Sequence, residues 1–344
     1  MKKLSILFTM VFAVSLAFAQ NTAVVNQEGN SNTGYVDQNG SGQEIYLDQI
    51  GDDNTSTVDQ DGIGNEGYVA QGMVEGYFWS PSTAMKGNRN KSTFIQNGEE
   101  NYGEIVQVGN DNITSVNQQG NNNEAYSYQG WPFGFWGETA ITAALKTTNG
   151  VVNIKQLTSN NFAASWTYGG NNNKTTISQS IGEENLASVS QGFIYLDAPY
   201  DFSSPVYNVK DNIATILQAG ASNIGKVMQL GNANNFKLTQ NGDGNSVGYS
   251  ASASGLLESR NAYFEQDGNR NTFTGTQNDG AELLSTSRQT GDDNVVTLIQ
   301  NASDVAEIIQ DGDWNIATVK QYGGGQDAYV GQFGNGNTAT VTQQ

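Results

Sequence analysis

The sequence predicts an all-β fold, a β-solenoid of about twelve rungs with two short strands per rung. Three observations predict it. Glutamine recurs every eleven residues over long stretches, as at Gln27, Gln38 and Gln49. Glycine follows most of these glutamines by two residues, and asparagine follows by five. Between each asparagine and the next glutamine, the residues alternate with the period of two that is typical of strands. A disordered Gln/Asn-rich chain would not keep three residue types in one phase.

The repeated unit reads Q-x-G-x-x-N-x-h-x-h-x-Q, where h is a small or apolar residue. Its first part is rich in Gly, Asn and Asp, which tolerate positive φ angles, so we expect a turn there. Its second part is a strand, and in 54–60 one face carries Asn54, Ser56, Val58 and Gln60. We expect this face to point inward, with apolar side chains at the centre and amides at both ends.

Stacked rungs lie about 4.8 Å apart, so each Gln would lie on a Gln and each Asn on an Asn. Their side-chain amides can then form hydrogen-bonded ladders along the axis, which satisfies buried polar groups. The predicted stacking ladder comprises Gln27, Asn32, Gln38, Gln49, Asn54, Gln60, Asn65, Gln71, Gln107, Asn112, Gln118, Gln229, Asn234, Gln240, Asn294, Gln300, Asn315, Gln321, Gln332, Asn337 and Gln343.

Four insertions interrupt the repeat, at 72–86, 130–148, 192–210 and 250–259. In a count of about twenty-five strands they follow every fourth strand, which places all four on one edge of the solenoid. Three of them are aromatic, and their residues are Tyr77, Phe78, Trp79, Trp131, Phe133, Phe135, Trp136, Phe193 and Tyr195. Two interpretations remain open. The loops either fold back over one flank, or they bind a partner such as a surface glycan.

The first nineteen residues have the features of an export signal. Lys2 and Lys3 precede a short apolar stretch, and Ala17-Phe18-Ala19 is a small-x-small cleavage site. We therefore expect residues 1–19 to be a signal peptide and 20–344 to be a single solenoid domain with the four insertions. No other segment is apolar enough to be a membrane span.

Charge and composition exclude several functions. The net charge is −19, which argues against a nucleic-acid partner. Histidine and cysteine are both absent, and no nucleophile–base motif occurs, so we expect neither an enzyme nor a cofactor. Adjacent carboxylates such as Asp52 and Asp53 lie on predicted turns, where they would add solubility. Whether calcium binds these acidic turns is left open.

The repeat resembles that of the curlin family. The stretch 332–343, QFGNGNTATVTQ, is similar to the curlin pattern Q-x-G-x-G-N-x-A-x-x-x-Q, and 60–71 fits except for Gly67 at the alanine position. Curlins are subunits of curli, the secreted functional amyloid of Gram-negative biofilms. The resemblance implies self-polymerisation, a dedicated outer-membrane secretion pore and a nucleator subunit as partners, and an extracellular or cell-surface location. It also implies that the Asn and Gln ladder drives polymerisation.

We therefore expect a structural subunit of a curli-like fibre that supports biofilm matrix and adhesion. The alternative is a monomeric or nucleating cell-surface adhesin that binds a glycan or another partner through the aromatic loops.

Overall fold

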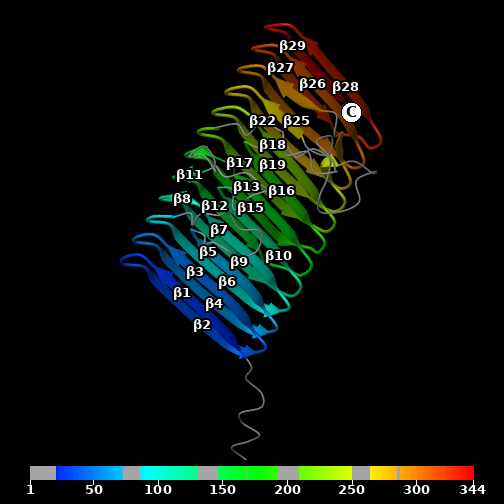
Figure 1. Cartoon of the computed structure of the whole chain (residues 1–344). Helices are drawn as coiled ribbons and strands as arrows, with labels where there is room; N and C mark the ends of the chain where they lie inside the picture. Colours follow the sequence, from blue (N-terminus) through cyan, green and yellow to red (C-terminus); the bar gives the residue numbers. More distant parts are fainter. Residues whose placement is uncertain are drawn as a thin grey trace, which may run out of the picture.

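The computed structural model describes residues 21–72, 86–130, 146–167, 169–192, 209–249, 264–284 and 287–344. Every regular element in these residues is a β-strand. The chain alternates between two long parallel sheets, sheet A with 14 strands and sheet B with 12 strands (Figure 1). The expected all-β solenoid with two strands per rung is confirmed.

Sheet A contains the first strand of each rung. Along the axis it consists of β1 (Thr22–Glu28), β3 (Glu44–Ile50), β5 (Glu66–Gln71), β7 (Tyr102–Gln107), β10 (Glu124–Gln129), β13 (Phe162–Thr167), β16 (Leu186–Gln191), β18 (Ile224–Gln229), β20 (Ser246–Tyr249) with β21 (Phe264–Asp267), β23 (Glu282–Leu284) with β24 (Arg288–Thr290), β26 (Val305–Asp311) and β28 (Asp327–Phe333).

Sheet B contains the other strand of each rung. Along the axis it consists of β2 (Thr33–Ser41), β4 (Thr55–Ile63), β6 (Lys91–Glu99), β9 (Ile113–Gln119), β12 (Val151–Gln156), β15 (Lys174–Ile181), β17 (Ile213–Ala219), β19 (Asn235–Asn241), β22 (Thr272–Asn278), β25 (Val295–Asn301), β27 (Ile316–Gln321) and β29 (Thr338–Gln343). A small third sheet of β8 (Gly109–Asn110), β11 (Thr147–Thr148) and β14 (Gly170–Asn171) lies at the corner between them.

Both long sheets have the same number of layers, because two layers of sheet A are each divided between two strands. β20 and β21 both pair with β18, β20 with its first half and β21 with its second half. β23 and β24 divide the next layer in the same way. The sequence-based count of about twenty-five strands treats 246–249 and 264–267 as two full strands, so it exceeds the number of layers in the two sheets. The fourth expected insertion instead lies between the two halves of one layer.

The core is a narrow apolar column between the two sheets. In β4 the buried residues are Ser56, Val58 and Gln60, whereas Thr57 and Asp59 between them are exposed. This alternation puts the small-or-apolar, apolar and amide positions of the repeat inside. The same column continues through Phe94 on β6 and Ile154 on β12 to Val319 on β27.

The departure from the curlin pattern at Gly67 has a packing reason. A Cβ on Gly67 would overlap the ring of Phe94, and a Cβ on Gly103 in the next layer would lie 2.5 Å from the same ring. Interiors are close-packed, so a large side chain on one sheet requires small ones opposite. Phe94 is fully buried as a result.

Two corners connect the sheets in every rung. We call the corner that follows a sheet A strand the first corner, and the one that follows a sheet B strand the second corner. Gly62, in the second corner, has a φ of 123° that few other residues adopt. A Cβ there would overlap the backbone oxygen of the next rung's glycine, so the stacking itself also requires glycine.

Three of the expected insertions begin where sheet A strands end. β5, β10 and β16 end at Gln71, Gln129 and Gln191, and the next strands of sheet B begin at Lys91, Val151 and Ile213. The last residues of two expected insertions belong to the first corner, since Thr147 and Thr148 form β11 and Lys210 makes a bridge to Asn171. In the described part of the chain, no helix has the length and apolarity to cross a membrane.

Candidate functional site

A row of glutamine side chains runs the whole length of sheet B. Each Nε2 donates to the Oε1 of the glutamine one rung further on, at 2.7–3.1 Å. Its members are Gln38, Gln60, Gln96, Gln118, Gln156, Gln179, Gln218, Gln240, Gln277, Gln300, Gln321 and Gln343. Every bond points in the same direction, from the first rung toward the last.

The second hydrogen of each amide fixes this direction. Gln118 Nε2, for example, also donates to the backbone oxygens of Tyr102 at 2.9 Å and Asn123 at 3.0 Å. An oxygen in that place would face two acceptors, so the amide can be oriented in one way only. The ladder therefore ties the end of sheet B to the start of sheet A in every rung.

The glutamine row of sheet A is interrupted once. It runs from Gln27 to Gln129, where Thr167 occupies the next position, and resumes from Gln191 to Gln332. Thr167 donates to Gln191 at 3.2 Å, but the buried Nε2 of Gln129 has no hydrogen-bond partner among the described residues. The next strand of sheet B also begins with Gly150 in place of asparagine, and a Cβ there would lie 2.8 Å from that Nε2.

The asparagines stack in a different way from the glutamines. Asn54 Oδ1 accepts the backbone N–H of Asn90 on the next rung at 3.0 Å, and Asn54 Nδ2 donates to the Gly87 carbonyl at 2.6 Å. The same pair of bonds recurs at Asn234 and Asn315. These side chains thus satisfy backbone groups at the corners, in addition to the amide–amide contacts of pairs such as Asn101 with Asn65.

The structure places the residues of the predicted ladder in four rows. Gln27, Gln49, Gln71, Gln107, Gln229 and Gln332 lie at the ends of sheet A strands, and Gln38, Gln60, Gln118, Gln240, Gln300, Gln321 and Gln343 at the ends of sheet B strands. Asn65 precedes a sheet A strand, and Asn32, Asn54, Asn112, Asn234, Asn294, Asn315 and Asn337 precede sheet B strands.

Ten ladder glutamines are absent from the predicted set. They are Gln96, Gln129, Gln156, Gln179, Gln191, Gln218, Gln266, Gln277, Gln289 and Gln310. Several follow an insertion or a turn of changed length, so the eleven-residue step fails there. The local strand pattern that ends in Gln, used without the step, would have found most of them.

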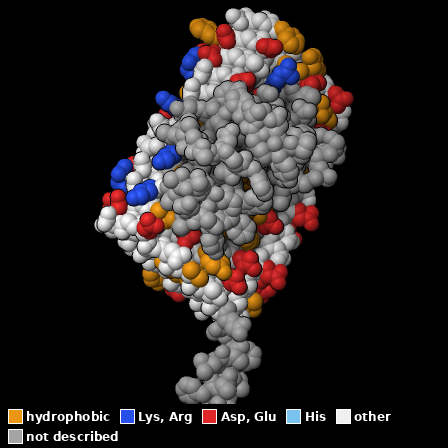
Figure 2. Space-filling model, viewed as in Figure 1, with side chains coloured by type: hydrophobic (Ala, Val, Ile, Leu, Met, Phe, Trp, Pro, Cys, Tyr) orange, Lys and Arg blue, Asp and Glu red, His pale blue; other side chains and the backbone are white. Residues whose placement is uncertain are grey.

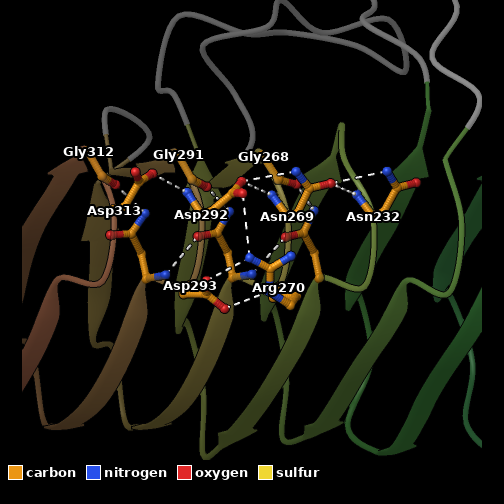
Figure 3. Close-up of polar contacts among 12 residues, drawn as sticks. Asn232, Gly268, Asn269, Arg270, Gly291, Asp292, Asp293, Gly312 and Asp313 are labelled. Carbon is orange, nitrogen blue, oxygen red and sulfur yellow. Dashed lines mark hydrogen bonds and ion pairs between the residues drawn. The ribbon is translucent and has the colours of Figure 1, made fainter. Parts of the chain in front are cut away.

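A further row of polar side chains lies at the first corner and is shown in Figure 3. The backbone N–H of Asn269 donates to Asp292 Oδ1 at 2.9 Å, and that of Asp292 donates to Asp313 Oδ1 at 2.8 Å. Arg270 makes two bonds of 2.7 Å to Asp293. Arg89 and Asp111 make the same bidentate pair elsewhere in the corner. The arginine hydrogen bonds hold the pKa of Asp293 and of Asp111 below the usual range.

The outward side of sheet A carries a second apolar cluster. Ala70, Val106 and Tyr128 are buried there, and Tyr126 and Trp166 pack against them. Tyr128 donates to Glu104 Oε2 at 2.6 Å, and burial raises the pKa of the Glu104 carboxyl despite this bond. The middle of this face is therefore not a free surface.

The predicted partner-binding residues lie outside the described residues, as does the expected signal peptide. These residues are Tyr77, Phe78, Trp79, Trp131, Phe133, Phe135, Trp136, Phe193 and Tyr195.

The described residues contain no group of three or more carboxylates placed to hold a metal ion. The second carboxylates of the adjacent pairs, Asp53, Glu100, Glu184 and Asp293, all have positive φ angles of 53–60°. They are turn residues, and the Asp293 carboxylate is already engaged by Arg270.

These features define the class of the protein, a parallel β-solenoid held together by amide ladders. The family model of the curlin associated repeat matches residues 20–51, 306–333 and 317–344. The chain therefore carries curlin repeats at both ends of the solenoid, and the resemblance found in the sequence is confirmed. No curated protein matches the chain. The curlin repeat family is structural rather than enzymatic, comprises secreted extracellular fibre components that self-assemble, and suggests a curli-type, amyloid-related protein.

Proposed function

We propose that this protein is a structural subunit of a secreted curli-like amyloid fibre, which grows by end-to-end stacking and supports biofilm matrix and adhesion. The observation that carries the proposal is the common direction of the two glutamine ladders. Gln332 and Gln343 on the last rung each use one amide hydrogen on a backbone oxygen, which leaves the other free to donate along the axis. Among the described residues, none donates to the Oε1 of Gln27 or Gln38 on the first rung.

The two end rungs are also in phase. The first rung is β1 and β2, and the last is β28 and β29, so a second copy would place sheet A on sheet A and sheet B on sheet B. Val25 on the first rung is 45% exposed although its side chain lies at a core position. A stacked copy would bury it, and it would extend the column of apolar side chains across the junction.

The outward residues at such a junction do not repel one another. Continuation of the register places Tyr329 next to Val24 and Thr342 next to Asp37. Within the chain, by contrast, Asp37 and Asp59 are direct neighbours, and stacked like charges are unfavourable. The junction therefore brings less like-charge repulsion than the contact between Asp37 and Asp59 that the fold already contains.

The test uses two adjacent residues of β29. Val341 points toward the core and Thr340 points outward, so Val341→Asp puts a charge into the junction whereas Thr340→Asp leaves it on the surface. We expect wild type and Thr340→Asp to form fibres with a 4.7–4.8 Å meridional reflection, and Val341→Asp to remain monomeric with unchanged circular dichroism. A wild-type protein that stays monomeric at high concentration would refute the proposal.

The finer assignments rest on the curlin resemblance. We propose export through a dedicated outer-membrane pore and growth from a nucleator subunit in a Gram-negative bacterium. The alternative role, as a nucleating or monomeric adhesin that binds a glycan through the aromatic loops, predicts that their deletion abolishes binding. Deletion of the same loops from a fibre subunit is expected to spare growth.

A further inference from the structure

The outward charges of the solenoid are sharply sorted between its surfaces. On sheet B, the outward side chains of β6 to β29 include lysines, with threonine and serine between them, and the one carboxylate in these strands is Glu99, where β6 ends at the second corner. We call this surface the lysine face. Its charged members are Lys91, Lys155, Lys174, Lys237 and Lys320. Asp37 and Asp59, the outward carboxylates in the middle of sheet B strands, lie on the first two rungs only.

The second corner has the opposite charge. It carries exposed carboxylates on many rungs, and no Lys or Arg among the described residues. We call it the acidic ridge, and its members include Asp61, Glu99, Glu100, Glu183, Glu184 and Asp243. In Figure 2, acidic side chains lie along the right-hand edge of the view, whereas most of the visible Lys and Arg lie toward the left.

Among the described residues, the ridge carboxylates accept hydrogen bonds from neutral donors. Glu183 accepts from Asn160 at 3.4 Å, Glu184 from Ser222 at 3.4 Å, and Asp243 from the backbone of Ala221 at 2.6 Å. The ion pairs of Arg89 and Arg270, by contrast, lie at the first corner. No Lys or Arg in the described part of the chain forms an ion pair with the ridge carboxylates, on a chain whose total charge is −19.

Both surfaces are built on the same layer spacing, and their charges lie on some of the rungs of the stack. Two stacks lying side by side would therefore keep the same period, and a carboxylate on one could meet a lysine on the other at intervals along the whole length. A single exposed ion pair contributes little, but many pairs between two rigid rods act together, because each pair after the first forms without a new loss of freedom.

We infer that the acidic ridge of one copy docks on the lysine face of a second copy, which joins neighbouring stacks side by side into bundles. The inference rests on the proposed fibre function. Charge complementarity and the common layer spacing of the two stacks favour a second copy as the partner. The flat, threonine-rich sheet with exposed Lys155, Lys174 and Lys237 offers cations without competing carboxylates.

The test separates bundling from growth. We expect wild-type fibres to bundle at about 0.02 M salt and to separate into single fibres at about 0.5 M, where the Debye length is only a few ångströms. Fibre width is measured by electron microscopy, and growth is followed separately by fibre length. The face-reversed variant, Lys155→Glu/Lys174→Glu/Lys237→Glu, is expected to grow normally but to lose bundling. The matched Lys→Arg triple variant should bundle like wild type.

The decisive experiment exchanges the charges of the acidic ridge and the lysine face. The ridge-reversed variant, Glu99→Lys/Glu100→Lys/Glu183→Lys/Glu184→Lys, is also expected to give single fibres, and a mixture with face-reversed fibres should bundle again. Face-reversed fibres that bundle as wild type does would overturn the inference, as would a mixture that stays single. If wild-type fibres bundle only after an acidic polysaccharide such as polygalacturonate is added, the lysine face binds a polyanion and the second copy is not its partner. Absence of any fibre would refute the proposed function instead.

Discussion

The contribution of the glutamine ladder to stability can be measured at two adjacent glutamines. Gln118 lies in the sheet B ladder and is fully buried, whereas Gln119 beside it is exposed. Gln118→Leu keeps the volume of the side chain and removes its amide. It deletes the ladder bond from Gln96 at 3.0 Å and the ladder bond to Gln156 at 3.1 Å, together with the bonds from Gln118 Nε2 to two backbone oxygens.

The expected cost follows from the groups left behind. Gln96 Nε2 keeps its bonds to two backbone oxygens, so it loses one partner of several. Gln156 Oε1 loses its ladder donor while it stays fully buried, which costs about 1–3 kcal/mol. Two ladder bonds contribute a further 0.5–1.5 kcal/mol each, roughly, so we expect Gln118→Leu to lower the free energy of unfolding by about 2–6 kcal/mol.

The assay is native-state amide hydrogen exchange on the monomer at low concentration, because a solenoid can open locally and need not unfold as one unit. Protection should fall most on β9, β10 and β12, which neighbour the altered rung. Gln119→Leu should change stability by less than about 0.5 kcal/mol, as is usual for surface substitutions. Equal protection in the two variants would show that the ladder adds no stability beyond that of a buried side chain of the same volume.

Three further predictions follow from the site. Thr167→Gln should supply the missing partner of Gln129 Nε2 and raise stability by roughly 0.5–1.5 kcal/mol, measured by denaturant unfolding; no gain would mean that the gap is already filled, for example by water. Gly62→Ala should reduce the thermal midpoint strongly, because its Cβ would overlap the next rung, whereas Gly325→Ala, with open space around its Cβ, should cost only the strain of a positive φ. Burial raises the folded pKa of Glu104, so its contribution favours folding below the unfolded pKa of about 4.3 and is lost as the pH rises through the folded value. Stability profiles against pH should therefore diverge, with Glu104→Gln gaining on wild type above that range; parallel profiles would contradict this assignment.

The fold could be predicted because the repeat specifies position in each rung independently of neighbouring rungs. Asn54, Val58 and Gln60 point inward for the same reason that Asn315, Val319 and Gln321 do. Sequence reasoning failed where this phase is broken. Nothing local shows that 246–249 and 264–267 complete one layer, because that depends on pairing with β18.

The site was harder to predict than the fold, since each ladder contact joins residues from different rungs. The gap at Gln129 arises from Thr167 on the next layer of sheet A and from Gly150 on sheet B. Either residue alone looks like an ordinary exception to the repeat. The lysine face could not be predicted for a similar reason. Lys155 and Lys174 lie on neighbouring strands, and this can be recognised only when the register across the turn is known.

The direction of the ladders has a consequence for the shape of any fibre built from this protein. Both glutamine rows donate toward the last rung, so one end of the molecule presents amide hydrogens and the other presents amide oxygens. If two copies met by their last rungs, Gln343 would face Gln343 with donor against donor, and the buried groups would stay unsatisfied. Copies that stack as proposed must therefore all point the same way. The resulting fibre is polar, and its two ends need not add subunits at the same rate.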